Sequence, residues 1–406
     1  MSSFGWLDHS EHERRKALDV IKLLSERDTR DELGIGTVRD GFSDMFFPGT
    51  STIQTRARYF LFVPWIYLEL ENKHGRSAAE DVAQTARRRE LGLIEVLASS
   101  ADPAGTIGVV ARQNLKRLPS NIYWQGLGAW GIRVFSGTQP QYHRFLGRTQ
   151  KLGSVNTRDD DGEPIYRSVS ANWHPSIPEP PRGWAREASL SLLKREAVFL
   201  RERVLMQKRN TMLAFLIDNG LESGSESFPW QHRHFAEFPE GVKEQLQHAR
   251  SFSETIHGAA LLYNLMLAEK KANEDWIQDY RDRLGDWASS FSSRRAWYQK
   301  WNRKRFWEIV ASSGAKIPLG TRVFIDRWLG LTIEKIPSGA VGESDQTRTL
   351  IRERERSLKG ENGARLFSAR ALEIWDGRSG TQQLNFRWPQ ARTITADILT
   401  GLQGSY

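Results

Sequence analysis

The residues from Tyr59 to Tyr67 constrain the fold of this chain most strongly, because all of them are apolar or aromatic and one of them is proline. A helix that is apolar on every side has to be buried. We therefore expect this stretch to form the middle of the core, with the other elements packed around it. Pro64 is expected to kink the helix.

The apolar stretch is the second half of a longer unit. Thr37–Phe46 has helical character, and Phe47-Pro48-Gly49 is a breaker. After the breaker, Thr50 or Ser51 is well suited to cap a second helix that runs toward Leu70. The sequence thus predicts two helices across a tight turn, the second with a polar first half that approaches the surface.

Arg56 and Arg58 lie in that polar half. A helix N-terminus with free N–H groups, capping hydroxyls and two arginines can bind an anion, and phosphate is the obvious one. Alternatively, the hydroxyls only cap the helix and the arginines pair with acids such as Asp40 or Asp44. A third interpretation is a helix-turn-helix DNA reader, because the short turn contains glycine.

Four segments carry a family resemblance: SSFGWLDHSEHERRKALDVI, GTVRD, FPGTSTIQTRARYFLFVPWIY and, late in the chain, WDGRSGTQQLNFRW. With them the chain resembles, over nearly its whole length, a family of bacterial proteins catalogued as a domain of unknown function. The resemblance implies gene neighbourhoods of the mobile-element or defence type, with helicases and other nucleic-acid enzymes nearby. It brings no catalytic residues.

Composition narrows the possible classes of protein. The 406 residues contain no cysteine, which excludes disulfides, cysteine-ligated zinc, iron–sulfur clusters and thiol nucleophiles. The N-terminus has no apolar signal region and no stretch is long enough to span a bilayer, so we expect a cytoplasmic protein. The 58 basic against 49 acidic residues, a net charge of +9, favour polyanionic partners such as nucleic acid or acidic proteins.

Nearly every periodic segment fits a repeat of 3.6 residues, so we expect a mainly α fold, built as one multi-helix body or two helical lobes. An N-terminal helical region over residues 1–149 is followed by an irregular linker over 150–184, with a β-hairpin near 152–169. A C-terminal helical region covers 185–406. Residues 382–388 are expected to form a minor strand.

A long helix predicted from Val242 to Lys271 places Glu254 one turn before His257. The pair could act as a general base held by a carboxylate, although a semi-buried structural histidine is the commoner outcome. His232 and His234 have no carboxylate at a convincing metal spacing. We therefore expect neither a metal nor another cofactor.

The segment Ser293–Val310 alternates cations with aromatic residues. Cations that neutralise phosphates beside aromatics that stack on bases are typical of nucleic-acid surfaces. The equally weighted alternative is an amphipathic helix pair with its aromatics in the core and its arginines in water. The candidate contact residues are Arg294, Arg295, Trp297, Trp301, Arg303, Lys304 and Arg305.

Three functions follow from these features. The first is a non-enzymatic nucleic-acid-binding or scaffold subunit of a bacterial assembly, with DNA and a helicase or nuclease as partners and foreign DNA as its target. The second is an enzyme acting on nucleic acid or a phosphorylated substrate through an unfamiliar site built from Arg56, Arg58, His257 and Glu254. The third is a pure protein-interaction module.

Overall fold

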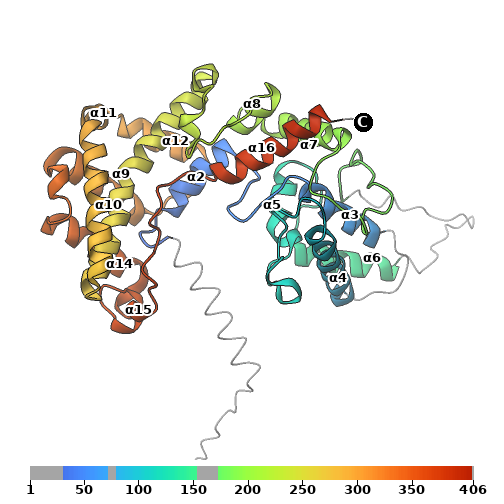
Figure 1. Ribbon diagram of the computed structural model, residues 1–406, viewed down its shortest axis with the longest axis horizontal. Coiled ribbons are helices and arrows are strands. Elements are labelled where there is room, and N and C mark those ends of the chain that lie inside the picture. The colour runs from blue at the N-terminus through green and yellow to red at the C-terminus, as the bar shows by residue number, and fades with distance from the viewer. Residues whose placement is uncertain (1–30, 72–78, 153–171, 405–406) are drawn as a thin grey trace, which may run out of the picture. The chain divides into compact units, whose positions relative to one another are not determined.

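A computed structural model describes residues 31–71, 79–152 and 172–404 (Figure 1). In these residues fifteen α-helices account for the regular structure, and the only β pairing is an isolated bridge between Arg133 and Trp173. The expectation of a mainly α fold is confirmed. None of the described helices combines the length and apolarity that a membrane span requires.

The chain divides into two compact units, each built from separate stretches of sequence. Unit 1 consists of Met1–Phe42 and Glu244–Leu384, and unit 2 of Ser43–Lys243 and Asn385–Tyr406. The helices α2 and α9 each begin in one unit and end in the other. This division differs from the expected regions 1–149, 150–184 and 185–406, which follow the order of the chain.

The helices of unit 2 begin after the short helix α2 (Gly36–Phe46). They are α3 (Tyr59–Glu71), α4 (Ala79–Ala98), the 3₁₀ turn η1 (Arg112–Asn114), α5 (Pro119–Ala129), α6 (Gln139–Leu152), α7 (Lys194–Lys208), α8 (Met212–Asp218), the 3₁₀ turns η2 (Pro229–Gln231) and η3 (Phe235–Glu237), and α16 (Trp388–Gln403).

Unit 1 contains most of α9 (Glu240–Lys270) and the helices from α10 to α15. They are α10 (Glu274–Ser293), α11 (Arg295–Gln299), α12 (Arg303–Ser312), α13 (Leu319–Leu329), the π-helix η4 (Gly330–Lys335), the 3₁₀ turn η5 (Ser338–Ala340), α14 (Asp345–Gly363) and α15 (Ala369–Glu373).

The helix α3 is the centre of the core of unit 2, as its sequence predicts. Every residue from Tyr59 to Tyr67 is buried. The ring of Phe60 stacks on Trp130 with 3.9 Å between centroids. Aromatic rings gathered from several helices thus surround α3, which explains why it is apolar on every side.

The predicted start of this helix is wrong. After α2 and the breaker, residues Ser51–Arg58 form turns, and α3 begins only at Tyr59. The Thr50 hydroxyl donates to the carbonyl of Phe47 and so closes the turn instead of capping a helix. The backbone N–H groups of Thr55 and Arg56 donate to the Tyr123 hydroxyl of α5, at 3.0 and 3.2 Å. This tertiary partner replaces the helical hydrogen bonds that local sequence suggests.

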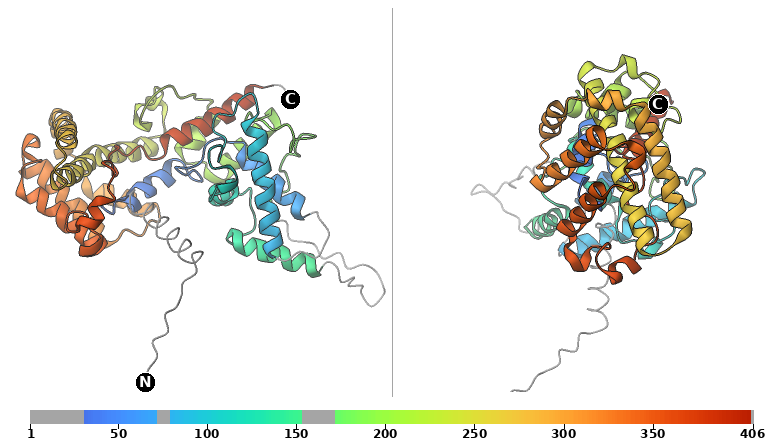
Figure 2. Two further views of the ribbon diagram at one scale, coloured as in Figure 1. Left: turned by 60° about the horizontal axis from the view of Figure 1, so that its bottom comes forward. Right: turned by 90° about the vertical axis from the view of Figure 1, so that its left-hand side faces the viewer.

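In unit 1 the long helices α9 and α10 run side by side (Figures 1 and 2). The predicted helix 242–271 is confirmed within two residues at its start and one at its end. Its stripe Phe252, Ile256, Ala259, Tyr263 and Leu267 is buried. A Cβ added to Gly258 would lie 2.4 Å from the Trp287 ring of α10, so glycine is needed for this close approach.

The minor strand expected at 382–388 is absent from the described residues. Phe386 and Arg387 have φ angles of 53° and 64°, which no strand accommodates. The carbonyl of Leu384 accepts the Ser253 hydroxyl instead of a ladder hydrogen bond. The β-hairpin expected near 152–169 lies outside the described residues, apart from Leu152 at the end of α6.

Candidate functional site

Arg56 lies between two acids from distant parts of unit 2. Its Nε donates to both carboxylate oxygens of Asp397 in α16 at 3.0 Å. One terminal nitrogen donates to Asp102 and to the carbonyl of Ala104, each at 2.9 Å. Asp397 also accepts the backbone N–H of Ala57 at 2.8 Å. A carboxylate of the protein itself thus occupies the place where an external anion was expected, just before α3.

Arg58 is buried, with 5% of its surface exposed. One terminal nitrogen donates to Glu196 of α7 at 2.8 Å, and the other donates to the carbonyl and hydroxyl of Ser189. The guanidinium also faces the rings of Phe62 and Trp65. Arg58 therefore joins the start of α3 to α7, and Asp40 and Asp44 are the partners of neither arginine in the described contacts.

Glu254 and His257 bind different partners and do not contact each other among the described contacts. The Glu254 carboxylate accepts hydrogen bonds from Arg250 and Arg294 at 2.8 Å and from the Tyr298 hydroxyl at 2.7 Å. His257 Nε2 lies 3.1 Å from the carbonyl of Thr381. Burial lowers the pKa of His257, so the ring is neutral at pH 7. Each residue has its own structural partner.

The aromatic residues of the segment Ser293–Val310, called the Arg/Trp segment below, divide into buried and exposed members. Tyr298, Phe306 and Trp307 are buried, as the amphipathic-helix alternative predicts. Trp301 is half-buried, and its Nε1 donates to His248 Nδ1 at 2.8 Å. Trp297 is different, because 46% of its surface is exposed.

The exposed Trp297 is held in place. Its Nε1 donates to the Ser251 hydroxyl at 3.1 Å, and the Arg294 guanidinium lies 5.8 Å from its ring centroid. An ordered ring loses little conformational entropy when a planar ligand stacks on its free face.

The cations of the segment also divide. Arg294 belongs to the Glu254 network, and Arg295 lies near the carbonyl of Ile336 at 3.4 Å. Arg303 pairs with Glu334, and Arg305 forms a two-pronged pair with Glu244 at 2.8 and 2.9 Å. The hydrogen bonds that Arg305 donates to Glu244 and Glu308 raise the pKa of its guanidinium.

Lys300 and Lys304 differ from these arginines. Both are exposed, and within the described part of the chain neither ammonium group has a hydrogen-bond or ion-pair partner. The sequence pattern gives no sign that Glu244 and Glu334 neutralise these arginines, because the two acids lie 61 and 31 residues away from the arginines that they contact. From the sequence alone, all the cations of the segment look equally available.

The first turn of α12 consists of Arg303, Lys304 and Arg305 and contains no acid. Asn302 caps it by accepting the backbone N–H of Arg305 at 2.9 Å. The N-terminus of a helix carries partial positive charge, so cations there are unfavourable unless an anion is near. Here Glu334 and Glu244 supply that anion for Arg303 and Arg305, and Lys304 is left without a partner among the described residues.

The two histidines after α8 show no sign of a metal centre. His234 Nδ1 lies 2.7 Å from Glu237, and His232 Nδ1 accepts the backbone N–H of His234. Among the residues that the structure describes, no group of three His, Cys, Asp or Glu side chains is arranged to hold a metal ion.

In its described residues the protein is a helical protein that carries an exposed basic and aromatic surface on α11 and α12. The chain belongs to the family described as "Family of unknown function (DUF6361)", which it matches over residues 1–400. This match confirms the family resemblance seen in the sequence. Neither the curated proteins nor the solved structures contain a significant match to the chain.

Proposed function

We propose that this protein binds single-stranded nucleic acid, without catalysis, through a surface formed by Trp297, Lys300, Arg303, Lys304 and Arg305. The observation that carries the proposal is the first turn of α12, where Lys304 has no partner among the described residues and the ion pairs of Arg303 and Arg305 are solvent-exposed. The N–H groups at a helix N-terminus favour a bound phosphate. The exposed ring of Trp297 nearby offers a face on which a base can stack.

The ion pairs of Arg303 and Arg305 are compatible with this role. Both pairs are solvent-exposed, with 38–48% of each side chain accessible. Exposed ion pairs stabilise a protein by only about 0–1 kcal/mol, so a phosphate can replace the carboxylate at little cost. Arg294 and Arg295 are better explained as structural residues, because the protein already engages their donors.

The enzymatic alternative has weaker support. Arg56 and Arg58 are bound to acids of unit 2, and Glu254 is bound to three donors in unit 1. A catalytic group needs a free lone pair or proton directed at a substrate. None of these side chains offers one in the arrangement described.

The assembly that we propose contains a helicase or nuclease and acts on foreign DNA, which is the setting that the family resemblance implies. Affinity purification from the native host, followed by identification of the co-purifying proteins, tests this part. Recovery of a nucleic-acid enzyme supports it. Recovery only of proteins without any nucleic-acid role favours the protein-interaction module.

Binding and turnover are separated by one experiment on the purified protein. Labelled single-stranded and duplex DNA and RNA are incubated with it, with and without magnesium, and both complexes and products are measured. The proposal predicts complexes, tightest for single strands, and intact nucleic acid. Cleaved or modified nucleic acid would establish the enzymatic alternative, and no complex at low salt would contradict nucleic-acid binding.

A further inference from the structure

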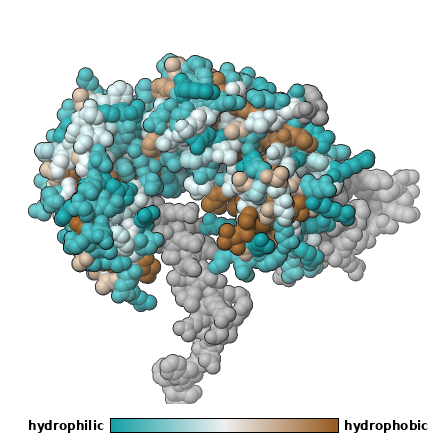
Figure 3. Space-filling view, viewed as in Figure 1, coloured by the Kyte–Doolittle hydropathy of each residue, from teal (hydrophilic) through white to brown (hydrophobic). Residues whose placement is uncertain are grey.

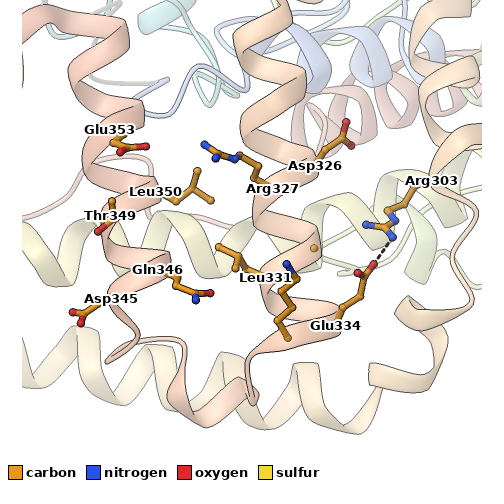
Figure 4. Close-up of a pocket in the computed structure, with 12 residues that line it drawn as sticks. Arg303, Asp326, Arg327, Leu331, Glu334, Asp345, Gln346, Thr349, Leu350 and Glu353 are labelled. Atoms are coloured by element: carbon orange, nitrogen blue, oxygen red, sulfur yellow. Dashed lines mark hydrogen bonds and ion pairs between the residues drawn. The ribbon is translucent and has the colours of Figure 1, made fainter.

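A pocket of about 790 Å³ lies within unit 1, beside the proposed nucleic-acid surface (Figure 4). One wall is α13 with the π-helix η4, and the other is α14. This volume suits a small organic molecule. The residues that line it are Arg303, Asp326, Arg327, Gly330, Leu331, Glu334, Lys335, Asp345, Gln346, Thr349, Leu350 and Glu353.

The π-helix shapes the first wall. A π-turn is rare, is less favourable than an α-turn, and frequently occurs at functional sites. Here Arg327, Leu331 and Lys335 follow one another at steps of four and all line the pocket. Gly330 lies among them without a side chain, and a Cβ placed on it meets no atom within 4 Å. The pocket is thus left open at a glycine.

Both walls carry charged side chains, and several of these have no ion-pair partner among the described residues. Arg327 and Lys335 are exposed cations without a partner among the described residues. The same holds for Glu353 on α14. Figure 4 shows Arg327 and Glu353 extending toward each other from the two walls, yet no ion pair joins them. The gap between them leaves room for a ligand.

Between these charges the pocket offers hydrogen-bonding and apolar groups. Gln346 and Thr349 supply an amide and a hydroxyl from α14, and Leu331 and Leu350 supply apolar surface. No aromatic residue is among the lining residues. A nucleobase or sugar ring would therefore find no stacking partner, which argues against a nucleotide.

We propose that this pocket binds a small zwitterion, a free amino acid. Its carboxylate is bound by Arg327 and Lys335, because guanidinium groups hold carboxylates through paired hydrogen bonds. Its ammonium group is bound by Glu353, and its aliphatic part lies on Leu331 and Leu350. This inference does not depend on the proposed nucleic-acid binding, because the two ligands contact different residues apart from Arg303.

Calorimetric titration of the full chain with each of the twenty standard amino acids tests the proposal. At least one should bind, and its N-acetyl and its amide derivatives should each bind at least tenfold more weakly. Arg327→Gln and Glu353→Gln should each lower the affinity at least tenfold. Glu373→Gln, an exposed carboxylate on α15 outside the pocket, is the matched control and should have no effect.

A steric variant provides a second test. Gly330→Leu should fill the open space and abolish binding, because the residue has helical angles and an unobstructed Cβ direction. Gly285→Leu makes the same change at an unobstructed glycine of α10 outside the pocket and should leave binding intact. Circular dichroism verifies that each variant is folded. If Gly330→Leu does not fold, the Arg327 and Glu353 variants alone decide whether the pocket binds the amino acid as proposed.

Three results would overturn the proposal. One is that none of the amino acids binds. Another is that the derivatives blocked at one end bind as tightly as the free amino acid. The last is that inorganic phosphate alone binds as tightly, with Glu353→Gln unaffected, since this marks a simple anion site.

Discussion

The Asp397 carboxylate of α16 binds both the Nε of Arg56, at 3.0 Å, and the backbone N–H of Ala57, at 2.8 Å. Asp397 and Arg56 are 341 positions apart in the chain. Asp397 thus supplies the anion that the sequence pattern before α3 favours. Removing it should turn a filled site into an empty one.

Asp397→Ala should therefore lower the free energy of unfolding by about 1.5–3 kcal/mol, because Arg56 loses its charged hydrogen bonds to Asp397 and keeps its pair with Asp102. Inorganic phosphate should restore part of this loss, since a ligand that binds only the folded state stabilises it. Urea denaturation at increasing phosphate concentration measures both effects. Equal responses of the variant and the wild type to phosphate would contradict this account.

Because of the buried Glu90, we expect the folding stability to depend on pH. Its carboxylate is buried and accepts the backbone N–H and the hydroxyl of Ser120, both at 2.7 Å. Burial raises the pKa of Glu90 to about 7, against 4.5 in an exposed carboxyl. Between pH 4.5 and about pH 7, the folded state therefore holds this proton while the unfolded state loses it. The stability that this group contributes is therefore complete below about pH 4.5 and is lost as the pH rises through 7.

Glu90→Gln, which cannot ionise, removes this dependence. Relative to the wild type, the variant should gain about 3 kcal/mol of unfolding free energy between pH 4.5 and pH 8, from 1.36 kcal/mol for each unit of pKa shift. Parallel denaturation series across this range give the difference directly. A difference that stays constant with pH would show that Glu90 is not the titrating group.

The cations of the Arg/Trp segment should separate into two groups by their effect on stability. Arg294→Ala removes the charged hydrogen bond that Arg294 donates to Glu254, and it should lower the free energy of unfolding by about 1.5–3 kcal/mol. Lys304→Ala removes a solvated side chain and should change stability by less than about 0.5 kcal/mol. Chemical denaturation of the two variants measures this. Equal costs would mean that the assigned partners do not matter.

The two tryptophans should separate in the same way. Trp297→Ala should reduce single-strand affinity by roughly 1–3 kcal/mol with little change in stability, because its ring is exposed. Trp301→Ala should mainly reduce stability, since it loses the hydrogen bond to His248 and the contact with Phe306. Affinity and unfolding measured on both variants distinguish the roles. Loss of affinity only through Trp301 would contradict the assignment.

Local sequence patterns predicted where helices form better than they predicted which side chains contact each other. The apolar run Tyr59–Tyr67 and the stripe along α9 had the correct helical character and burial, because periodicity reports which side of a helix faces the core. The predicted start of α3 was wrong, because the Tyr123 hydroxyl and the Asp397 carboxylate bind the backbone just before Tyr59 from distant positions in the sequence.

The candidate site shows the same limit. Arginines 56, 58, 294, 303 and 305 look alike in sequence, yet each pairs with an acid at least 31 positions away. Sequence spacing carries no signal for such pairs. Lys300, Lys304 and the exposed face of Trp297 stand out only when those partners are known.

The salt dependence of single-strand binding tests the central claim most directly. The double variant Lys300→Glu/Lys304→Glu should remain folded, because both side chains are exposed and without partners in the described structure. Each lost phosphate contact should reduce the slope of log affinity against log salt by about 0.7, the value for single strands. The matched control is Lys316→Glu/Arg370→Glu, which makes the same charge change at exposed positions of unit 1 that are not part of this surface. We predict a slope about 1.4 smaller in the first variant and near the wild-type value in the control. Identical slopes in the wild type and both folded variants would contradict nucleic-acid binding at this surface.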